Sequence, residues 1–332
     1  MTKPRIAVVG AGSFGRNHLR VIHQSPNAEL AGVLDLDGAR ARQAAENHGC
    51  PVFDSLEQLA EHADAAVIAT PTVTHSDIGC RLMELGVDVL VEKPIAHEPA
   101  AARRLVDDAA RLHRILLVGH LERFNPAIIA LESAISQPLF FEIHRMSEFS
   151  PRSLDVDVVL DLMIHDLDIV LSLTGSAPEE IRAAGISILS AKVDIANVRL
   201  QFPGGCIANF TASRVSTERV RKLRLFQPHE YISLDYSRQD AVRFRVGEGM
   251  KIDFAPLPVA KDEPLRLEIE HFIECVSSKS EPTSGPEPRR QPRVTGAQGL
   301  AALDLAFAIL AKIEEHSRLV AGTLGASRSS VR

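Results

Sequence analysis

The chain has 332 residues, of which 45% are hydrophobic, so it is long enough to bury the cores of roughly two domains. Its 37 basic and 43 acidic residues give a net charge of −6 without any basic block, which argues against a nucleic-acid-binding protein. The cysteines are widely spaced and form no CxxC pair, which favours reduced thiols over a disulfide framework or a zinc site: Cys50, Cys80, Cys206 and Cys275.

Two apolar segments are candidates for targeting or membrane elements. The N-terminal apolar run covers only residues 6–9 before glycines follow, which is too short for a secretory signal. The segment "GLAALDLAFAILAKI" is interrupted by Asp304 and is too short to cross a bilayer, so we interpret it as a buried helix. We therefore expect a soluble cytoplasmic protein with no membrane partner.

Strands and helices alternate through the first 120 residues. Helices are expected after the first strand as far as residue 22, at 38–48 and at 99–112, with others between the later strands. This alternation predicts right-handed βαβ units and a parallel sheet, the Rossmann type of α/β domain. The expected strands occupy residues 5–9, 28–37, 63–72, 87–94 and 114–120.

Beyond about residue 135 the pattern becomes mainly strands, so we predict an α+β domain with a large, mainly antiparallel sheet. Pro203-Gly204-Gly205 predicts a hairpin turn, and a closing helix is expected at 297–316. The expected strands occupy residues 139–149, 179–189, 194–202, 205–213, 220–227, 229–236 and 241–247. The predicted division is a dinucleotide-binding domain at 1–122, a substrate-binding and oligomerisation domain at 123–322 with a Pro-rich loop at 280–293, and a flexible tail at 323–332.

A glycine-rich turn follows the first strand directly. Gly10, Gly12 and Gly15 form G-x-G-x-x-G around Ser13 and Phe14 at the start of a helix. The first glycine permits a tight turn, the second lets a pyrophosphate approach the backbone, and the third lets the helix pack on the strand. The helix N-terminus adds unbonded N–H groups and a partial positive charge. The pattern predicts dinucleotide binding.

The second strand ends in Asp35, twenty residues after Gly15. A carboxylate at this place accepts hydrogen bonds from an adenosine ribose and repels a 2′-phosphate. Arg40 is near, but we expect it on the following helix. The pattern favours NAD over NADP, and the alternative interpretation of Asp35 is an ordinary turn residue at the strand end.

Chemistry-bearing side chains follow at two further places. Lys93 comes just past the fourth strand, at the edge where open α/β sheets bind ligands. Asp161, His165 and Asp168 stand at i, i+4 and i+7 of an expected helix and share one face. A strand-end lysine is often a solvated surface residue, and an Asp/His pair is often a helix-surface hydrogen bond. We see no third ligand with the spacing of a metal site.

Five motifs occur together in one order: "GAGSFG", "ATPTVTH", "EKP", "ERFNP" and Asp-x-x-x-His-x-x-Asp. Over essentially the whole chain this series resembles the Gfo/Idh/MocA family of NAD(P)-dependent sugar oxidoreductases. Within the family, "GHLERFNPAI" and "DLMIHDLDIV" are most similar to members that oxidise the 3-hydroxyl of UDP-N-acetylglucosamine. Those members supply a 3-keto sugar nucleotide for amination toward diamino-sugar lipid A.

The resemblance implies roles for individual residues. His165 would be the base that takes the hydroxyl proton, Asp161 would orient its ring, and Lys93 would donate to the same oxygen. Asp168 is expected to be structural. The implied cofactor-lining residues are Thr70, Pro71, His75, Glu92 and Lys93.

The resemblance also implies substrate contacts. Arg123 and Asn125 in "ERFNP" are expected to face the substrate, although Asn125-Pro126 is equally typical of a plain helix start. A sugar diphosphate requires guanidinium groups, for which Arg145, Arg214 and Arg219 are candidates on or beside the predicted sheet.

Three functions follow from the sequence. The first is NAD-dependent oxidation of a UDP-sugar, and the second is dehydrogenation of a free sugar or inositol by the same residues. The third is a non-catalytic NAD-binding sensor, which would not need Lys93 and His165 together. A homodimer or homotetramer is expected by analogy, because an open sheet leaves one face to be covered.

Overall fold

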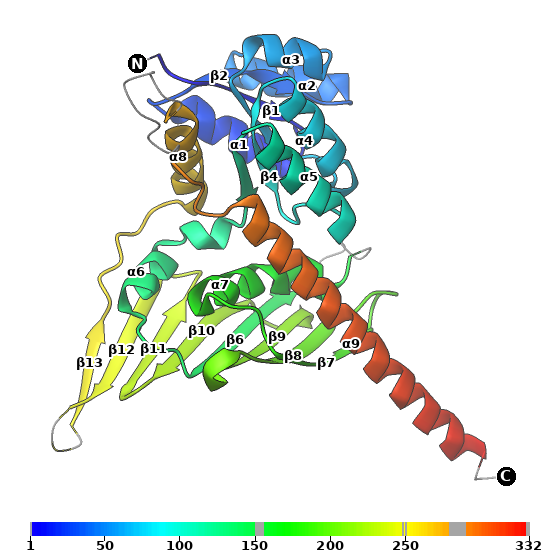
Figure 1. The fold of residues 1–332 in the computed structure, drawn as a ribbon, viewed down its shortest axis with the longest axis vertical. Helices are drawn as coiled ribbons and strands as arrows, with labels where there is room; N and C mark the ends of the chain where they lie inside the picture. Colours follow the sequence, from blue (N-terminus) through cyan, green and yellow to red (C-terminus); the bar gives the residue numbers. More distant parts are fainter. Residues whose placement is uncertain (1, 150–155, 248, 250, 279–289, 330–332) are drawn as a thin grey trace. The chain divides into compact units, whose positions relative to one another are not determined.

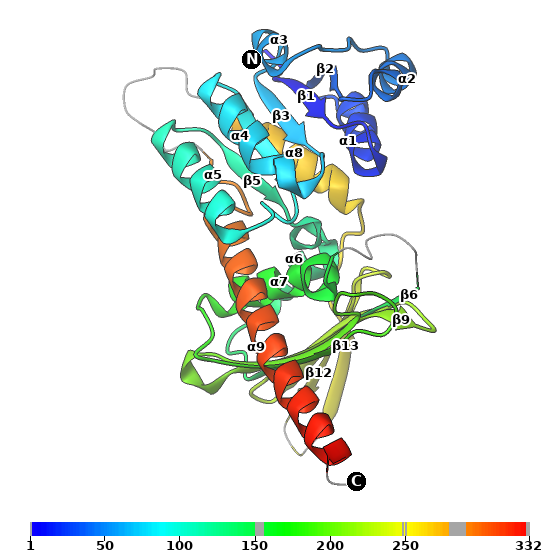
Figure 2. The ribbon, with the colours of Figure 1, turned by 90° about the vertical axis from the view of Figure 1, so that its right-hand side faces the viewer.

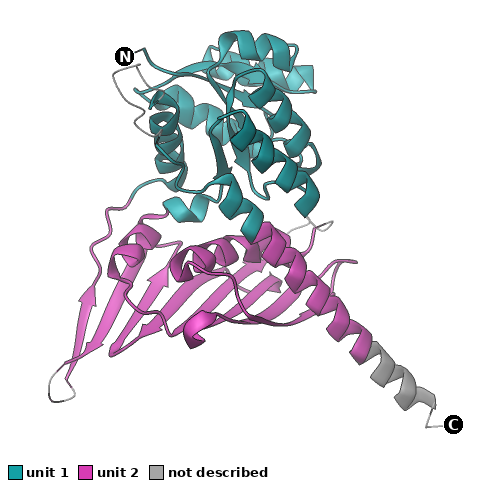
Figure 3. Ribbon diagram, viewed as in Figure 1, with its two compact units in different colours: residues 1–124, 262–301 teal, residues 125–261, 302–332 magenta. Residues whose placement is uncertain are grey.

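The computed structural model describes residues 2–149, 156–247, 249, 251–278 and 290–329, with no account of side chains beyond residue 319. The chain forms two compact units, which Figure 3 distinguishes by colour. Unit 1 comprises residues 1–124 and 262–301, and unit 2 comprises residues 125–261 and 302–332. Each unit is described by itself.

Unit 1 is built on a five-stranded parallel sheet in the order β2-β1-β3-β4-β5 (Figure 1). Its central strands are apolar except for charged residues at the ends of β1 and β4, because helices bury both of their faces. The predicted parallel sheet is confirmed. The strands are β1 (Arg5–Val9), β2 (Glu29–Leu34), β3 (Ala65–Ile68), β4 (Asp88–Glu92) and β5 (Leu116–Gly119).

Helices connect these strands, and several carry the end signals expected from their sequence. Asp37 accepts the N–H groups of Ala39 and Arg40 at the start of α2, and Gly49 ends that helix in the left-handed conformation. The elements are α1 (Ser13–Gln24), α2 (Gly38–His48), α3 (Leu56–His62), η1 (Thr72–Thr74), α4 (His75–Glu84), α5 (Pro99–Arg111) and η2 (Leu121–Phe124).

A further helix, α8 (Pro264–Ser277), returns from unit 2 and belongs to unit 1. Three side-chain contacts tie it to α1 and the turn that follows: Arg20 pairs with Glu263, while Ser25 and Asn27 donate to Glu270 at 2.7 and 2.8 Å. The division predicted from the sequence assigned this whole segment to the second domain. The structure corrects it, because residues 262–301 pack with the first.

Unit 2 contains an eight-stranded sheet in the order β13-β12-β11-β10-β6-β9-β8-β7. Its pairs are antiparallel except β6 with β9, which confirms a mainly antiparallel sheet. The strand β13 was not predicted. The strands are β6 (Phe140–Glu148), β7 (Glu180–Ile186), β8 (Ile195–Gln201), β9 (Ile207–Ser216), β10 (Val220–Gln227), β11 (Glu230–Asp235), β12 (Asp240–Val246) and β13 (Ile252–Pro256).

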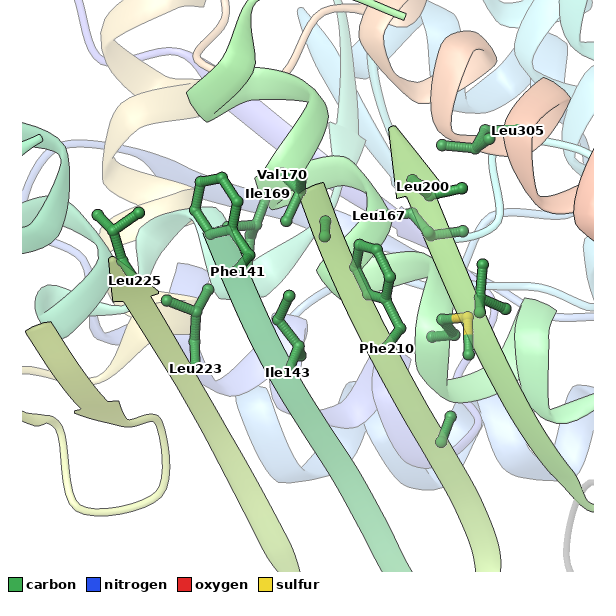
Figure 4. Close-up of a cluster of buried hydrophobic side chains, with 14 of the residues drawn as sticks. Phe141, Ile143, Leu167, Ile169, Val170, Leu200, Phe210, Leu223, Leu225 and Leu305 are labelled. Atoms are coloured by element: carbon green, nitrogen blue, oxygen red, sulfur yellow. The ribbon is translucent and has the colours of Figure 1, made fainter. Parts of the chain in front are cut away.

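One face of this sheet carries the core of unit 2. Buried residues alternate along β8 and β6, as expected for a sheet with one covered face. The helices α6 (Pro126–Ala134) and α7 (Ile164–Thr174) lie on that face (Figure 2). Figure 4 shows Phe141 and Phe210 on the side of the sheet that faces α7, the helix that carries Leu167, Ile169 and Val170.

The last helix, α9 (Gly296–Ser329), is longer than predicted. Residues 296–319 are long and apolar enough to cross a membrane by composition, with mean hydropathy 1.4, but 44% of the apolar window is buried, and core helices pass the same test. Leu305, Ile309 and Ile313 pack into the unit 2 core. The helix continues to Ser329, so the predicted flexible tail from residue 323 is helical that far. Most of the predicted Pro-rich loop, 279–289, lies outside the described residues.

Candidate active site

The glycine turn has the close packing that its spacing predicts. Gly10 has φ +96°, and a Cβ there would stand 2.5 Å from the carbonyl oxygen of Ala69. A Cβ on Gly15 would stand 1.8 Å from the carbonyl oxygen of Gly10. Gly12 differs, because a Cβ there would meet nothing within 4 Å. Two glycines therefore make the turn possible, and the third leaves open space for a pyrophosphate beside the backbone.

The N-terminus of α1 suits the same ligand. Its N-cap, Gly12, offers no side chain to bond the first N–H groups, and the first turn contains no acidic residue. Ser13 and Phe14 are both exposed there, Phe14 at 60%. Unbonded N–H groups and the helix dipole attract an anion at this end. These residues fit the phosphates of a dinucleotide.

Asp35 is fixed against the glycine turn. Its Oδ2 accepts the N–H of Ala11 at 2.7 Å, and its Oδ1 accepts the N–H of Asp37 at 2.8 Å. Each carboxylate oxygen keeps capacity for a further hydrogen bond, as two ribose hydroxyls require. Arg40 lies on α2 as expected, with its Nη1 3.6 Å from Oδ2 of Asp35.

His75 links two loops at the ends of β3 and β4. Its Nε2 lies 2.9 Å from the carbonyl oxygen of Thr70, and its Nδ1 lies 3.0 Å from that of Pro94. The side chain is buried, and burial lowers the pKa of His75, against the raising effect of the two carbonyl oxygens. A neutral imidazole donates to one of these two carbonyl oxygens, so His75 links the loops, and its cofactor-lining role stays a prediction.

The Thr70 hydroxyl is also occupied locally. It lies 2.8 Å from the hydroxyl of Thr74, which donates to the carbonyl oxygen of Pro71 at 2.8 Å. These bonds shape the turn after β3, whose backbone the resemblance assigns to the cofactor. Thr70 and Pro71 keep that implied role as a prediction.

Glu92, at the end of β4, is held by two partners. Its Oε1 lies 2.7 Å from Nε2 of His18 on α1, and its Oε2 accepts the N–H of Lys93 at 3.2 Å. The His18 side chain is 1% exposed and that of Glu92 15%. His18 was not predicted from the sequence, although its place on the helix after the glycine turn is a signal that could have found it. The bonds fix the backbone at the point where Lys93 begins.

The helix that carries the unit 2 candidates begins with a π-helical turn, η3 (Val159–Met163), and continues as α7. A π-turn holds more residues than an α-turn, and such turns are frequent at functional sites. Asp161 lies in the π-turn and His165 in the first turn of α7. Both are partly exposed, whereas Asp168 is 2% exposed. The predicted shared face of three residues is thus divided, with Asp168 directed into the protein.

Asp166, next to His165, anchors α7 to the sheet. Its carboxylate pairs with Arg145 of β6 through two bonds, Nε–Oδ2 at 2.7 Å and Nη2–Oδ1 at 2.9 Å. The Tyr236 hydroxyl donates to Oδ1 at 3.1 Å, and the Arg145 guanidinium lies 5.0 Å from the centre of the Tyr236 ring. Both ion-pair side chains are 2% exposed. The sequence analysis missed this network, which lies one residue from the predicted base.

The two residues of "ERFNP" whose substrate contacts stay predictions are both buried against backbone groups. Asn125 is 3% exposed; its Oδ1 accepts the N–H of Ala127 as the N-cap of α6, and its Nδ2 donates to the carbonyl oxygen of Tyr236 at 3.1 Å. This is the helix-start alternative that the sequence left open. Arg123 is 5% exposed and donates to the carbonyl oxygen of Arg293. Both residues shape the backbone.

The three arginines predicted as candidates to bind a diphosphate differ in burial and in their ion pairs. Arg145 belongs to the buried pair with Asp166, and Arg214 lies 3.1 Å from Asp194 with both side chains buried. Arg219 is exposed on the turn between β9 and β10 and remains the candidate of the three. Among the described residues, no group of three or more His, Cys, Asp or Glu side chains could hold a metal ion.

Comparison with known proteins identifies this arrangement. The model of the "oxidoreductase family, NAD-binding Rossmann fold" matches residues 4–120, and that of the Gfo/Idh/MocA C-terminal domain matches residues 127–227. The chain belongs to the Gfo/Idh/MocA family. It is an oxidoreductase with an NAD-binding Rossmann domain, which confirms the predicted family, fold class and nicotinamide cofactor.

Relatives within the Gfo/Idh/MocA family include dehydrogenases of two substrate classes. The UDP-N-acetylglucosamine 3-dehydrogenase of Acidithiobacillus ferrooxidans is 36% identical over 284 residues, covering 84% of this chain and 90% of that enzyme. A solved structure of that enzyme matches with a TM-score of 0.87 over 95% of this chain and 99% of the other, at 33% identity. The inositol 2-dehydrogenase of Rhizobium meliloti is 27% identical over 95% of this chain and 98% of that enzyme.

Proposed function

We propose that this Gfo/Idh/MocA member is an NAD-dependent dehydrogenase that oxidises the 3-hydroxyl of UDP-N-acetylglucosamine to a ketone. The observation that carries the proposal is its 36% identity, over 84% of the chain, to an enzyme named for that reaction. The product would be a 3-keto sugar nucleotide, consistent with a place before amination in diamino-sugar lipid A formation.

The chain's residues supply what this reaction requires. Removal of the hydroxyl proton needs a base, for which His165 is suited because histidine titrates near neutrality. Asp161 would orient the imidazole and stabilise its protonated form. Lys93 would donate to the same oxygen as negative charge develops on it. Bound NAD would accept the hydride from the carbon.

The experiment that tests the substrate compares three compounds. We expect NADH formation with UDP-N-acetylglucosamine and at least a hundredfold less with N-acetylglucosamine, since uridine diphosphate would supply much of the binding energy (about 2.7 kcal/mol corresponds to a factor of 100). Turnover of myo-inositol in place of the UDP-sugar would indicate that the enzyme acts on an inositol, like the inositol dehydrogenases. NAD binding without turnover on any of them would favour a sensor.

We propose NAD as the cofactor, with Asp35 selecting against NADP. Asp35→Ser removes the carboxylate that would accept the ribose hydroxyls, so NAD affinity is expected to fall by roughly 10- to 100-fold, the equivalent of a lost charged hydrogen bond. NADP affinity should rise, because Arg40 loses a carboxylate partner and the repulsion of a 2′-phosphate disappears. Titration calorimetry with both cofactors measures this.

The control for Asp35→Ser is Glu46→Gln, which removes one negative charge from an exposed site on α2, the helix that carries Arg40. It should leave both affinities within about twofold, since exposed charges are screened by salt. Equal affinities of wild type and Asp35→Ser for NAD would contradict the assignment of Asp35.

We also propose a homodimer or homotetramer formed through the face of the unit 2 sheet opposite α6 and α7. A row of aromatic rings with neighbouring centroids 4.8–5.8 Å apart supports this: Phe140, Phe226, Tyr231, Phe244 and Phe254. Large exposed apolar patches mark interaction surfaces. Light scattering is expected to give a dimer or tetramer in the wild type and a smaller species in Phe244→Glu; a wild-type monomer would remove the proposal.

We place the enzyme in the cytoplasm. All four cysteines lie in the described part of the chain, and none forms a disulfide. Burial raises the pKa of both Cys80 and Cys206 to about 11, which keeps these thiols protonated and unreactive. Such thiols suit a reducing compartment. Cell fractionation tests the location.

A further inference from the structure

Glu268 is a buried carboxyl group that the proposed reaction does not use. It lies on α8, is 0% exposed, and neither of its oxygens has a hydrogen-bond partner among the described residues. Its neighbours Ile269 and Phe272 are also fully buried. An ionised carboxylate in such surroundings would lose its hydration without compensation, which disfavours the charged form. The group therefore requires a physical explanation.

The charge that acts on Glu268 is that of Glu92. Burial raises the pKa of Glu268 well above its ordinary value, and repulsion by Glu92 raises it further. For Glu92 burial acts in the same direction, but the bond from His18 and the neighbouring Lys93 outweigh it and lower its pKa. When two carboxyl groups repel each other in a buried region, the one with partners for its charge ionises first, and here that group is Glu92.

Three other charged side chains, on α8 and on the elements packed against it, have partners of their own. On α1, Arg20 pairs with Glu263. On η2, the Arg123 guanidinium donates to the carbonyl oxygen of Arg293. On α8 itself, Glu270 accepts from Ser25 and Asn27.

We propose that Glu268, buried without a hydrogen-bond partner, keeps its proton in the folded protein and acts through Glu92 as a positioning residue for Lys93. One negative charge then stays on Glu92, where His18 and the Lys93 N–H hold it at 2.7 and 3.2 Å. A second charge at Glu268 would push Glu92 away from these two partners. The positioning part rests on the proposed function, because it assumes that Lys93 acts on the substrate; the bound proton does not.

The retained proton makes stability depend on pH with a definite sign. Above the ordinary pKa of 4.5, Glu268 releases its proton in the unfolded chain but keeps it in the folded one. The unfolded state then binds fewer protons, so the wild type loses stability as pH rises, by up to tenfold in the unfolding constant per pH unit, until the folded group also ionises. Glu268→Gln cannot ionise and escapes this loss.

The first experiment measures the proton without any substrate. Infrared spectra at pH 7 are expected to show a protonated carboxylic C=O band in the wild type that is missing in Glu268→Gln and present in the control Glu274→Gln, an exposed position on the same helix. In urea unfolding, Glu268→Gln should gain stability over the wild type between pH 5 and pH 7, by up to a hundredfold in the unfolding constant over these two units. If the wild type lacks this C=O band and its stability difference from Glu268→Gln does not change with pH, Glu268 does not keep its proton. This conclusion holds whatever the substrate is.

The second experiment tests positioning through kinetics. Glu268→Ala is expected to lower kcat roughly tenfold with little change in KM, as for other groups that support a reacting residue. Glu268→Gln should restore most of this loss, since a neutral amide fills the same space. Equal kcat values in Glu268→Ala and the wild type, or equal losses in both variants, would overturn the positioning role. If the protein turns over no substrate, the infrared spectra still show whether Glu268 is protonated in the folded protein.

Discussion

His165→Asn is expected to lower kcat by roughly 10²- to 10⁴-fold, the usual contribution of a general base. Asparagine preserves polarity at this partly exposed position but cannot take the hydroxyl proton at neutral pH. The affinity for NAD should stay within about twofold, because the groups assigned to its phosphates and ribose, Gly12 and Asp35, belong to unit 1. Initial rates of NADH formation and calorimetric NAD titration measure the two effects separately.

Lys93→Met provides the companion variant, and His62→Asn the control. Methionine keeps the apolar length of lysine but cannot donate to the reacting oxygen, so kcat should fall by roughly 10²-fold or more. His62 is exposed on α3, where it contacts the carbonyl oxygen of Gln58 and the ring of Phe53, so its replacement should leave kcat unchanged. Full activity in either His165→Asn or Lys93→Met would remove that residue from the mechanism.

Arg145→Met is expected to lower the free energy of unfolding by about 3–5 kcal/mol, the cost of breaking a buried ion pair by removing one partner. The loss is large because the Asp166 carboxylate, 2% exposed, would remain with its charge uncompensated beside the Tyr236 hydroxyl. Urea unfolding followed by circular dichroism measures it.

The same strand provides a control for the Arg145 prediction. Arg224 and Glu142 form a pair on the sheet at 3.0 Å, with side chains 42% and 34% exposed. Arg224→Met should therefore cost no more than about 1 kcal/mol, since solvent screens exposed pairs. The double variant Arg145→Met/Asp166→Leu should recover most of the stability. Equal losses in the two single variants would contradict the distinction between buried and exposed pairs.

Much of the cofactor-binding part of unit 1 could be predicted from the sequence, because local sequence patterns determine it. Gly10, Gly12 and Gly15 stand beside the strand and helix whose packing requires them, and Asp35 follows the second strand by a short turn. The alternation of strands and helices likewise predicted the order of the strands β1 to β5 in unit 1. These features depend on neighbours within some thirty residues, the scale of one βαβ unit.

The parts that sequence reasoning missed depend on contacts between distant segments. The charge of Glu92 acts on Glu268 only because α8 returns to unit 1, and nothing in the local pattern of α8 indicates that return. The pair of Arg145 with Asp166 requires the placement of β6 beneath α7. The π-turn at Val159–Met163 has no periodicity that separates it from an α-helix.

Hydride transfer from the C3 carbon of UDP-N-acetylglucosamine is the central claim, and deuterium at C3 tests it most directly. With NAD and this labelled substrate, the account predicts one deuterium atom in the reduced cofactor by mass spectrometry. It also predicts a UDP-sugar product without deuterium at C3. NADH that forms without the label would place the oxidation at another carbon and contradict the proposed reaction, while the Gfo/Idh/MocA membership would stand.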